Sequence, residues 1–417
     1  MKLLMVTAAY PYGHGESFVK AELDHVGAYF DEVEVVPCSL NAASVPRPMT
    51  QPINLEYANK RWGLFRKFHL LSSLAVALWK YNWVHDVIHI ATHPHKFVNL
   101  KELVRCLYRA RLFELFLKGQ AAKNKKDVDL VYFYWIVPEI MGAIGYRKES
   151  ASRMRIVSRA HGGDLYEDRR AGGYVGLQDG IAAGIDDIFC ISAHGKNFLD
   201  DKYPAMKAKF HTARLGVSDP GYLNLQPRDA PLSIVSCSFV VAGKRLQLIA
   251  DAVAWLLDRH PNLAIRWTHV GDGELYDQLR AYVDRTLNNR ATVVFKGYLT
   301  QDQLADLYRN EPFDVVVNVS DCEGIPVSLM EASAVSIPMV ATDVGGTSEI
   351  VNGANGVLIP ADADIATIAT AIVGFRDRAS AAARRNSARS QWEENFNAHA
   401  NYNAFGRRLV QLLEPVQ

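Results

Sequence analysis

The 417-residue sequence has few cysteines, no long apolar run and almost no net charge, and each absence narrows what the chain can be. Its five cysteines are scattered, odd in number and without C-x-x-C spacing, which predicts small apolar side chains in a reducing compartment. The longest apolar stretch, Leu70 to Trp79, is far too short to cross a bilayer. Residues Met1 to Thr7 lack the apolar length and cleavage pattern of a signal peptide and predict a first strand. We therefore expect a cytoplasmic protein.

The composition predicts a soluble globular chain of two domains. Hydrophobic residues make up 49% of the sequence and charged residues 22%, which excludes a disordered chain. A chain of 417 residues is longer than a single domain with one hydrophobic core usually is. The formal net charge of +1 indicates no partner, but the charge is unevenly distributed. Residues 60–126 carry 14 Lys or Arg against three Asp or Glu, a local net charge of +11.

Strand and helix patterns alternate through both halves, which predicts an α/β protein with parallel sheets and helices on both faces. We expect each half to form a Rossmann-like, doubly wound domain. Segment 219–231 has three prolines and no periodicity and predicts a linker, so the domains would span 1–218 and 232–390. The helical sequence at 391–417 needs a partner surface, and we expect it to pack back on the first domain. The predicted strands are 3–7, 33–37, 130–134, 155–158, 187–191, 232–236, 264–270, 292–295, 314–319, 338–342 and 356–359.

Two glutamates eight positions apart, Glu323 and Glu331, lie where a parallel α/β protein would hold its ligand. The apolar run 314–319 ends, a Gly-x-Pro turn follows, and a helical pattern begins near Pro326. Ligands bind outside the carboxyl ends of parallel strands, and the free N–H groups at a helix start favour an anion. The pair could therefore divide a long polar ligand between them.

Other loops at the same predicted edge carry cations or glycines. Lys244 and Arg245 open a predicted helix, where two cations suit a diphosphate. Gly271 follows a strand in a Gly-Asp-Gly sequence and lets the backbone approach a ligand closely. The Lys-Arg pair alone is typical of a solvated surface, and the Gly-Asp-Gly sequence alone is typical of an ordinary turn. Because both are predicted at the same sheet edge as the glycines of loop 345–349, a binding site is favoured.

The first half offers polar residues at two strand ends. Loop 10–17 bears glycines between the first strand and the first helix, and segment 159–164 follows the strand 155–158. Considered alone, the histidine of the second segment is a hydrogen-bonded residue at a strand end, and its aspartate is a cap. The candidate site residues of this half are Gly13, Gly15, Glu16, His161 and Asp164.

The Glu-x7-Glu motif within 322–332, together with 270–274 and 340–349, resembles the retaining glycosyltransferases of family four. These enzymes have the GT-B fold, in which two Rossmann-like domains face a cleft. Segment 159–166 resembles the branch that acts in exopolysaccharide, capsule and lipopolysaccharide synthesis. The resemblance is strong over about 233–360 and patchier before it.

The resemblance implies a role for each candidate residue of the second half. Glu331 would bind the ribose hydroxyls of a nucleotide, and Lys244 would hold its diphosphate with help from Arg245. Gly271 would also line the donor site. The donor sugar would be held by Glu323 and by the loop residues Gly324, Ile325, Pro326 and Val327.

The same resemblance implies roles for the candidate residues of the first half. His161 would contact the donor sugar near its reacting carbon. The loop with Gly13 and Gly15 would close over the phosphates or the acceptor, and Glu16 and Asp164 would contact the acceptor or the sugar.

The implied activity is that of a hexosyltransferase that retains anomeric configuration. The leaving phosphate would take the acceptor proton, so neither a metal nor a cofactor besides the nucleotide-sugar co-substrate is expected. The donor would be a UDP-sugar, with GDP-mannose left open. The acceptor would be a glycan or a lipid-linked glycan in cell-surface polysaccharide synthesis.

One departure from the family keeps other functions open. An Arg often stands five or six residues before the family's Lys, but this chain has Phe239 and Ser238 there. Either Arg245 supplies the missing charge or the donor binds more weakly. A catalytically weak nucleotide-sugar-binding subunit of a polysaccharide assembly complex is therefore a second interpretation. A nucleotide-sugar epimerase of similar architecture is a third.

The basic segment 60–126 also contains eight Trp and Phe residues, a mixture that predicts contact with an anionic membrane surface. The enzyme would then lie at the inner face of the cell membrane, near a lipid-linked acceptor. The alternative is a pair of amphipathic helices with a basic face in solvent. Nucleic acid is not expected as a partner, because no reader motif accompanies the charge.

Overall fold

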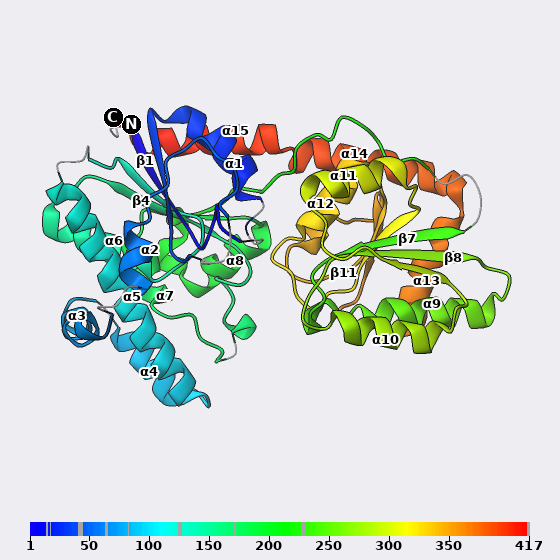
Figure 1. Cartoon of the computed structure of the whole chain (residues 1–417), viewed down its shortest axis with the longest axis horizontal. Helices are drawn as coiled ribbons and strands as arrows, with labels where there is room; N and C mark the ends of the chain where they lie inside the picture. The colour runs from blue at the N-terminus through cyan, green and yellow to red at the C-terminus, as the bar shows by residue number, and fades with distance from the viewer. Residues whose placement is uncertain are drawn as a thin grey trace. The chain divides into compact units, whose positions relative to one another are not determined.

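The computed structural model describes residues 1–13, 16, 18–40, 45–62, 66–81, 83–123, 127–170, 172–226 and 231–414, with side chains described for all of them except 60–62, 66–72, 378 and 379. The chain forms two compact units. The first comprises Met1–Ala213 with Tyr402–Gln417, and the second comprises Arg214–Asn401. Each is built around one parallel sheet (Figure 1).

The sheet of the first unit has six parallel strands in the order β2-β1-β3-β4-β5-β6. Successive side chains of the buried strand β1 face opposite layers of helices, as the two-residue period of a strand requires. Leu3 and Met5 pack with α1 and α15, whereas Leu4 and Val6 pack with α5 and α6. The strands are β1 (Lys2–Thr7), β2 (Glu32–Pro37), β3 (Leu130–Phe133), β4 (Arg155–Ala160), β5 (Asp187–Cys190) and β6 (Phe210–Thr212).

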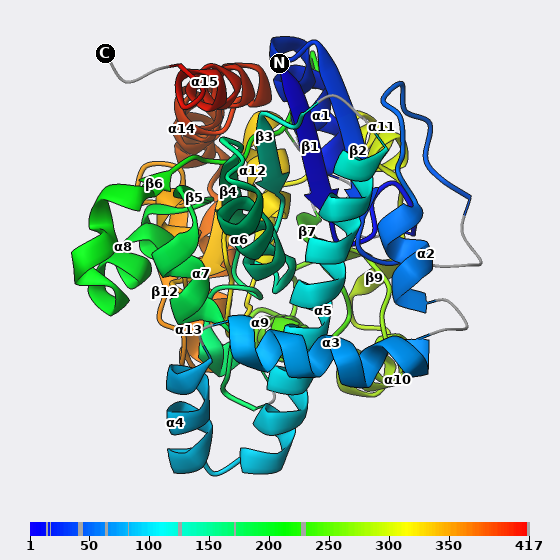
Figure 2. The same cartoon turned by 90° about the vertical axis from the view of Figure 1, so that its left-hand side faces the viewer.

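Helices cover both faces of this sheet, and α5 and α6 lie on the face formed by Leu4 and Val6 (Figure 2). Helices α3 and α4 both pack on the long helix α5, which in turn packs on α6. The helices are α1 (Val19–Val26), α2 (Glu56–Trp62), α3 (Arg66–Lys80), α4 (Val84–Thr92), α5 (Lys96–Ala122), α6 (Glu139–Ser150), α7 (Gln178–Gly184) and α8 (Ala193–Lys202).

The second unit has a six-stranded parallel sheet in the order β12-β11-β10-β7-β8-β9. Helices α9, α10 and α13 cover one face, and α11, α12 and α14 cover the other (Figure 1). Two apolar faces on the sheet explain why its strands have near-continuous apolar sequences. The elements are β7 (Leu232–Cys237), α9 (Gln247–Arg259), β8 (Ile265–Val270), α10 (Tyr276–Leu287), β9 (Thr292–Phe295), α11 (Gln301–Asn310), β10 (Val315–Asn318), α12 (Val327–Ala334), β11 (Met339–Thr342), β12 (Gly356–Ile359), α13 (Ile365–Val373) and α14 (Arg378–Asn395). The predicted α/β class with two doubly wound parallel sheets is confirmed.

The last helix, α15 (Ala398–Gln411), begins in the second unit and ends in the first. Trp392 of the preceding helix belongs to the second unit, where its Nε1 donates to the Val217 carbonyl at 3.1 Å. Phe405 and Leu409 are buried in the first unit. The segment predicted as one helical stretch from residue 391 is therefore divided between the two units.

Segment 219–226, predicted as the start of a linker, lies on the second unit. The Asn224 side chain donates to the carbonyls of Tyr308 and Glu311 at 2.6 and 2.8 Å, and Asp219 pairs with Arg389 at 2.8 Å. These contacts place the division of the chain at residue 213, before the predicted linker. Residues 227–230 of that linker lie outside the described residues.

None of the helices in the described part of the chain combines the length and the apolar character that a bilayer crossing needs.

Gly142 allows the close packing of α6 on α5, and its substitution tests that contact. A Cβ at this position would lie 2.1 Å from the Ala110 carbonyl oxygen, a backbone atom that cannot yield. We expect Gly142→Ala to destabilise the protein by about 1–3 kcal/mol, because overpacking outweighs the helix propensity that Ala gains. Urea denaturation followed by circular dichroism measures the change.

Gly163→Ala is the matched control in the same unit. A Cβ at Gly163 meets no atom within 4 Å, so its effect should stay within about 0.5 kcal/mol. Equal stabilities of the two variants would contradict the packing described for α5 and α6.

Candidate functional site

An ion pair joins two loops at the carboxyl edge of the second sheet. Lys244 closes a short helical turn after β7, and Glu323 lies in the loop between β10 and α12. Lys244 Nζ lies 2.6 Å from Glu323 Oε1. The carboxylate is buried, while 23% of the lysine side chain is exposed. The structure thus brings together two predicted residues that are 79 positions apart in the sequence.

Two more donors fix the Glu323 carboxylate. Ser320 Oγ and Asn318 Nδ2 donate to the same oxygen, Oε1, at 2.7 and 3.1 Å. Three donors thus converge on one oxygen of a buried carboxylate, which holds this side chain and its partner cation in place. Because an ammonium has three N–H donors, Lys244 can still donate toward an anion outside the sheet edge.

Arg245 is placed differently from its neighbour. Its backbone is left-handed, with a φ of 47°, and its guanidinium turns back onto the protein. It donates to the carbonyls of Val319 and Ala361, each at 2.8 Å, and to the Ser320 carbonyl at 3.1 Å. These bonds brace the loop that carries Glu323. The predicted contact of Arg245 with a donor phosphate stays a prediction.

Glu331 lies in α12, the helix that begins after the Glu323 loop. It is partly buried and accepts one hydrogen bond, from Gln301 Nε2 at 3.0 Å. Burial raises the pKa of its carboxyl to about 7. Near neutral pH this group therefore exists in both charge states, and a ligand hydroxyl that donates to it would favour the ionised one.

The neighbouring loops are held by backbone contacts. Gly271 has a φ of 139°, and a Cβ there would lie 1.8 Å from the Ser238 carbonyl oxygen, so only glycine fits. Its N–H donates to the Gly297 carbonyl at 2.8 Å. The Gly324 carbonyl accepts from Gly346 N at 2.9 Å, and the Ile325 side chain is buried. The remaining predicted loop residues are Pro326, which immediately precedes α12, and Val327, its first residue.

The first unit places His161 in an aromatic setting after β4. Its ring centroid lies 4.1 Å from that of Trp135 and 5.0 Å from that of Tyr134. The side chain is buried, and neither ring nitrogen has a hydrogen-bond partner among the described residues. A buried polar group without a partner suits a site that a ligand completes.

The carboxylates of Asp164 and Glu16 accept hydrogen bonds from other groups of the chain. Asp164 accepts from the N–H groups of Ile136 and His161, both at 2.7 Å. Glu16 accepts from three consecutive backbone N–H groups, those of residues 8–10, and from Trp135 Nε1 at 2.6 Å. Both carboxylates therefore shape the loops around His161.

Their predicted contacts with acceptor or sugar stay predictions. Gly13 has a φ of 72° and open space around its α-carbon. Gly15 lies outside the described residues.

Sequence reasoning missed four residues that support the predicted ones. Asn318 and Ser320 were detectable as polar residues that end an apolar strand. Gln301 and Trp135 carried no sequence signal, because their contacts to Glu331, Glu16 and His161 come from other elements. The described residues include no group of three or more His, Cys, Asp or Glu that could hold a metal ion.

Comparison with known families gives a direct match for the second unit. Residues 231–377 match the family model of the glycosyl transferases group 1. The matched segment contains the whole Lys244–Glu323 site and Glu331. It covers about a third of the chain.

Curated relatives point to polysaccharide biosynthesis. The amylovoran biosynthesis glycosyltransferase AmsK of Erwinia amylovora is 29% identical over 49% of this chain and 51% of its own. The putative colanic acid biosynthesis glycosyltransferase WcaL of Escherichia coli K12 is 28% identical over 50% and 52%. The chain thus spans about half the length of these two relatives.

Solved structures match over nearly the whole chain. HepE of Anabaena, solved in complex with UDP, is 16% identical, with a TM-score of 0.66 over 99% of this chain and 100% of its own. Sucrose-phosphate synthase of Thermosynechococcus elongatus is 14% identical, with a TM-score of 0.69 over 99% of each chain. At these identities the likeness shows the fold, and the predicted GT-B fold is confirmed.

The raised pKa of Glu331 predicts a pH-dependent effect of Glu331→Gln on stability. The folded pKa of about 7 lies above the ordinary glutamate value of 4.5, so ionisation destabilises the folded state increasingly as pH rises from about 4.5 to 7. Gln has no such cost. We expect Glu331→Gln to melt higher than the wild type at pH 8, and this difference to shrink toward pH 5. A difference that is constant across this range would contradict the assigned pKa.

Proposed function

We propose that this protein is a retaining glycosyltransferase that moves a sugar from a nucleotide-sugar to a glycan or lipid-linked glycan in cell-surface polysaccharide synthesis. The observation that carries the proposal is the Lys244–Glu323 pair at the carboxyl edge of a parallel sheet, inside the segment that matches the glycosyl transferases group 1. The UDP complex of HepE supports a uridine donor over GDP-mannose.

In the proposed reaction, Lys244 acts on the departing diphosphate. Negative charge builds on that group as the glycosidic bond breaks, so a cation fixed beside it stabilises the transition state more than the ground state. Glu323, Ser320 and Asn318 prevent the lysine from reorganising during the reaction. The leaving phosphate takes the acceptor proton, so the proposal needs neither a metal nor a separate general base.

The other predicted residues bind the rest of the donor. Glu331 accepts from the ribose hydroxyls, and its pKa of about 7 means that this binding strengthens as pH rises toward 8. Glu323 and the loop 324–327 hold the sugar hydroxyls. A hydroxyl of the transferred sugar bonds a ring nitrogen of His161, since neither nitrogen has a hydrogen-bond partner among the described residues and Nδ1 lies 3.8 Å from Asp164 Oδ2.

Two substitutions separate binding of the diphosphate from transfer of the sugar. We expect Lys244→Ala to weaken UDP binding by about 10-fold or more, because one charge-assisted hydrogen bond to the diphosphate is lost. Glu323→Gln should lower sugar transfer or donor hydrolysis by about 100-fold, because Lys244 loses the ion pair that fixes its position and the contacts of Glu323 to the sugar are lost. UDP affinity should stay within about threefold, because Lys244 keeps its charge for the diphosphate. Calorimetry with UDP and a hydrolysis assay over a panel of UDP-sugars measure both.

Arg290→Ala is the control. Arg290 lies before β9 at the opposite edge of the same sheet and pairs with Asp258 at 2.5 Å. It should change neither UDP binding nor transfer. Wild-type behaviour of both site variants would remove the proposed site, epimer formation without acceptor would indicate an epimerase, and UDP binding without turnover would indicate a binding subunit.

A further inference from the structure

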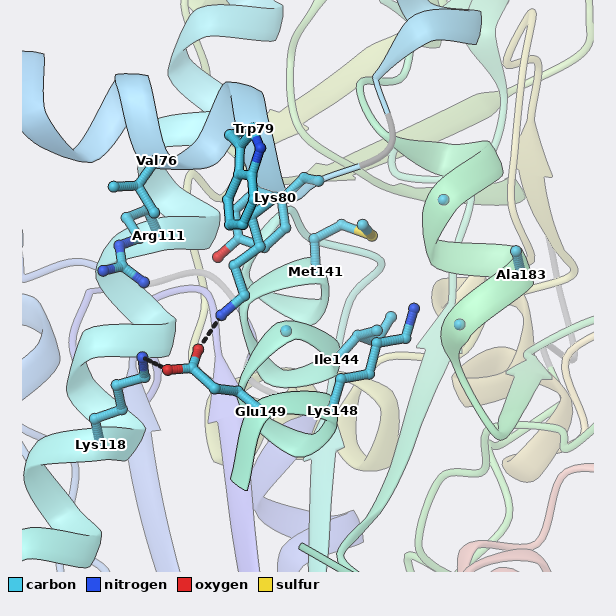
Figure 3. Close-up of a pocket in the computed structure, with 14 residues that line it drawn as sticks. Val76, Trp79, Lys80, Arg111, Lys118, Met141, Ile144, Lys148, Glu149 and Ala183 are labelled. Atoms are coloured by element: carbon cyan, nitrogen blue, oxygen red, sulfur yellow. Dashed lines mark hydrogen bonds and ion pairs between the residues drawn. The ribbon is translucent and has the colours of Figure 1, made fainter. Parts of the chain in front are cut away.

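A cavity of about 600 Å³ lies in the first unit between α3, α5, α6 and α7 (Figure 3). None of its lining residues belongs to the candidate site around His161. Its apolar lining comes from Val76, Met141, Ile144 and Ala183, and charged side chains lie among them. These include four cations, namely Lys80, Arg111, Lys118 and Lys148.

The buried carboxylate of Glu114 forms ion pairs with three of these cations. Glu114 has no exposed surface, and its Oε1 lies 2.8 Å from Arg111 NH1 and 3.2 Å from Lys118 Nζ, with Lys80 also paired to it. Tyr81 donates to its second oxygen at 2.6 Å. The charged lining is therefore preorganised, since these cations are already held when a ligand arrives.

Between Lys80 and Lys118, the carboxylate of Glu149 of α6 occupies the place of an anion. Its carboxylate accepts from Lys118 Nζ at 2.7 Å and also from Lys80 (Figure 3). These two lysines hold the pKa of Glu149 down to about 2, so the group is ionised at physiological pH. Yet its side chain is 52% exposed, and a solvent-exposed pair of this kind contributes little stability. An incoming anion could replace this carboxylate at small cost.

The cation count leaves room for a ligand charge. Four cations face the two carboxylates of Glu114 and Glu149, so two positive charges remain uncompensated. Lys148 has no hydrogen bond or ion pair with any residue that the structure describes.

Exposed apolar side chains lie on the rim of this cavity and on the helices α3, α4 and α5 beside it. Trp79, on its rim, is 90% exposed. Of the fifteen exposed large apolar side chains among those described, eight lie within residues 78–100, at the end of α3, on α4 and at the start of α5. Such a concentration next to a cationic cavity is typical of a surface that meets a lipid interface. The eight are Leu78, Trp79, Val84, Val87, Ile88, Phe97, Val98 and Leu100.

We propose that this cavity binds the headgroup phosphate of an anionic phospholipid, which displaces the Glu149 carboxylate from Lys80 and Lys118 while Trp79 and α4 enter the bilayer interface. The inference rests on the membrane contact expected for an enzyme with a lipid-linked acceptor and specifies which residues make it. It is independent of the donor site of the second unit.

Vesicle flotation with the full chain tests the inference, comparing phosphatidylglycerol-containing vesicles with pure phosphatidylcholine. We expect binding to the anionic vesicles only. Lys148→Glu should weaken it by more than about 10-fold, since each basic residue near the surface contributes about fivefold. Trp79→Ser should weaken it as well. Glu149→Gln should strengthen it several-fold, because the internal competitor is gone.

Matched controls separate this site from net charge. Glu394→Gln removes an exposed carboxylate of the second unit, and Lys207→Glu reverses an exposed lysine of the first unit outside the cavity. Each should leave binding nearly unchanged. Equal effects of Glu149→Gln and Glu394→Gln, or equal binding to both vesicle types, would overturn the proposal.

Two further measurements identify the source of the anion and separate this inference from the proposed activity. If the wild type binds inorganic phosphate in calorimetry and binds neither vesicle type, the cavity takes a free anion and the lipid assignment is wrong. UDP binding should be unchanged in Glu149→Gln and Lys148→Glu. If the wild type binds UDP but no anionic vesicles, the lipid site is refuted and the proposed activity is not. If the wild type binds anionic vesicles but no UDP, the proposed transferase activity is refuted and the lipid site is not.

Discussion

The parallel direction of every strand in each sheet is the constraint on which the rest of the structure depends. It brings the loops after β7, β8, β9, β10 and β11 to one edge of the second sheet, although they are spread over more than 100 residues of sequence. Lys244 and Glu323 meet there because β7 and β10 are neighbours in the sheet. The same geometry explains why the residues that brace this pair, Asn318 and Ser320, come directly from the end of a strand.

In the first unit, a buried ion pair near the end of β4 holds elements of the fold together. Arg159 of β4 and Glu22 of α1 are both fully buried, with Arg159 Nε 2.9 Å from Glu22 Oε2. The guanidinium also lies 4.2 Å from the ring centroid of Phe405, which belongs to α15. This network links the first helix, the strand that leads to His161 and the C-terminal helix. A buried ion pair of this kind is expensive to break, so it fixes the register of these elements.

Much of the fold could be predicted from sequence because its signals are local. Apolar runs such as 232–236 and 314–319 mark strands in both the sequence and the structure, and the Gly-x-Pro turn marks the loop before α12. The Glu-x7-Glu spacing identified the edge at which Glu323 and Lys244 meet.

The direction of polar side chains could not be predicted in the same way. Arg245 follows Lys244 directly, yet its left-handed backbone turns the guanidinium onto three carbonyls. Glu16 resembles a loop residue available to a ligand, yet four donors from residues 8–10 and Trp135 hold it inside the protein. Both outcomes depend on contacts made only after the loops fold. The cationic cavity likewise assembles from four helices, so the basic sequence of 60–126 indicated the charge of this region but not the cavity.

The central claim is that the carboxyl edge of the second sheet binds a nucleoside diphosphate beside Lys244. Amide hydrogen exchange with and without UDP tests it most directly, because the method reports where a ligand orders the backbone. The account predicts slower exchange in segments 238–246 and 320–331 and little change at the opposite edge of the sheet. Saturating UDP that leaves both segments unprotected, or that protects only other parts of the chain, would contradict it.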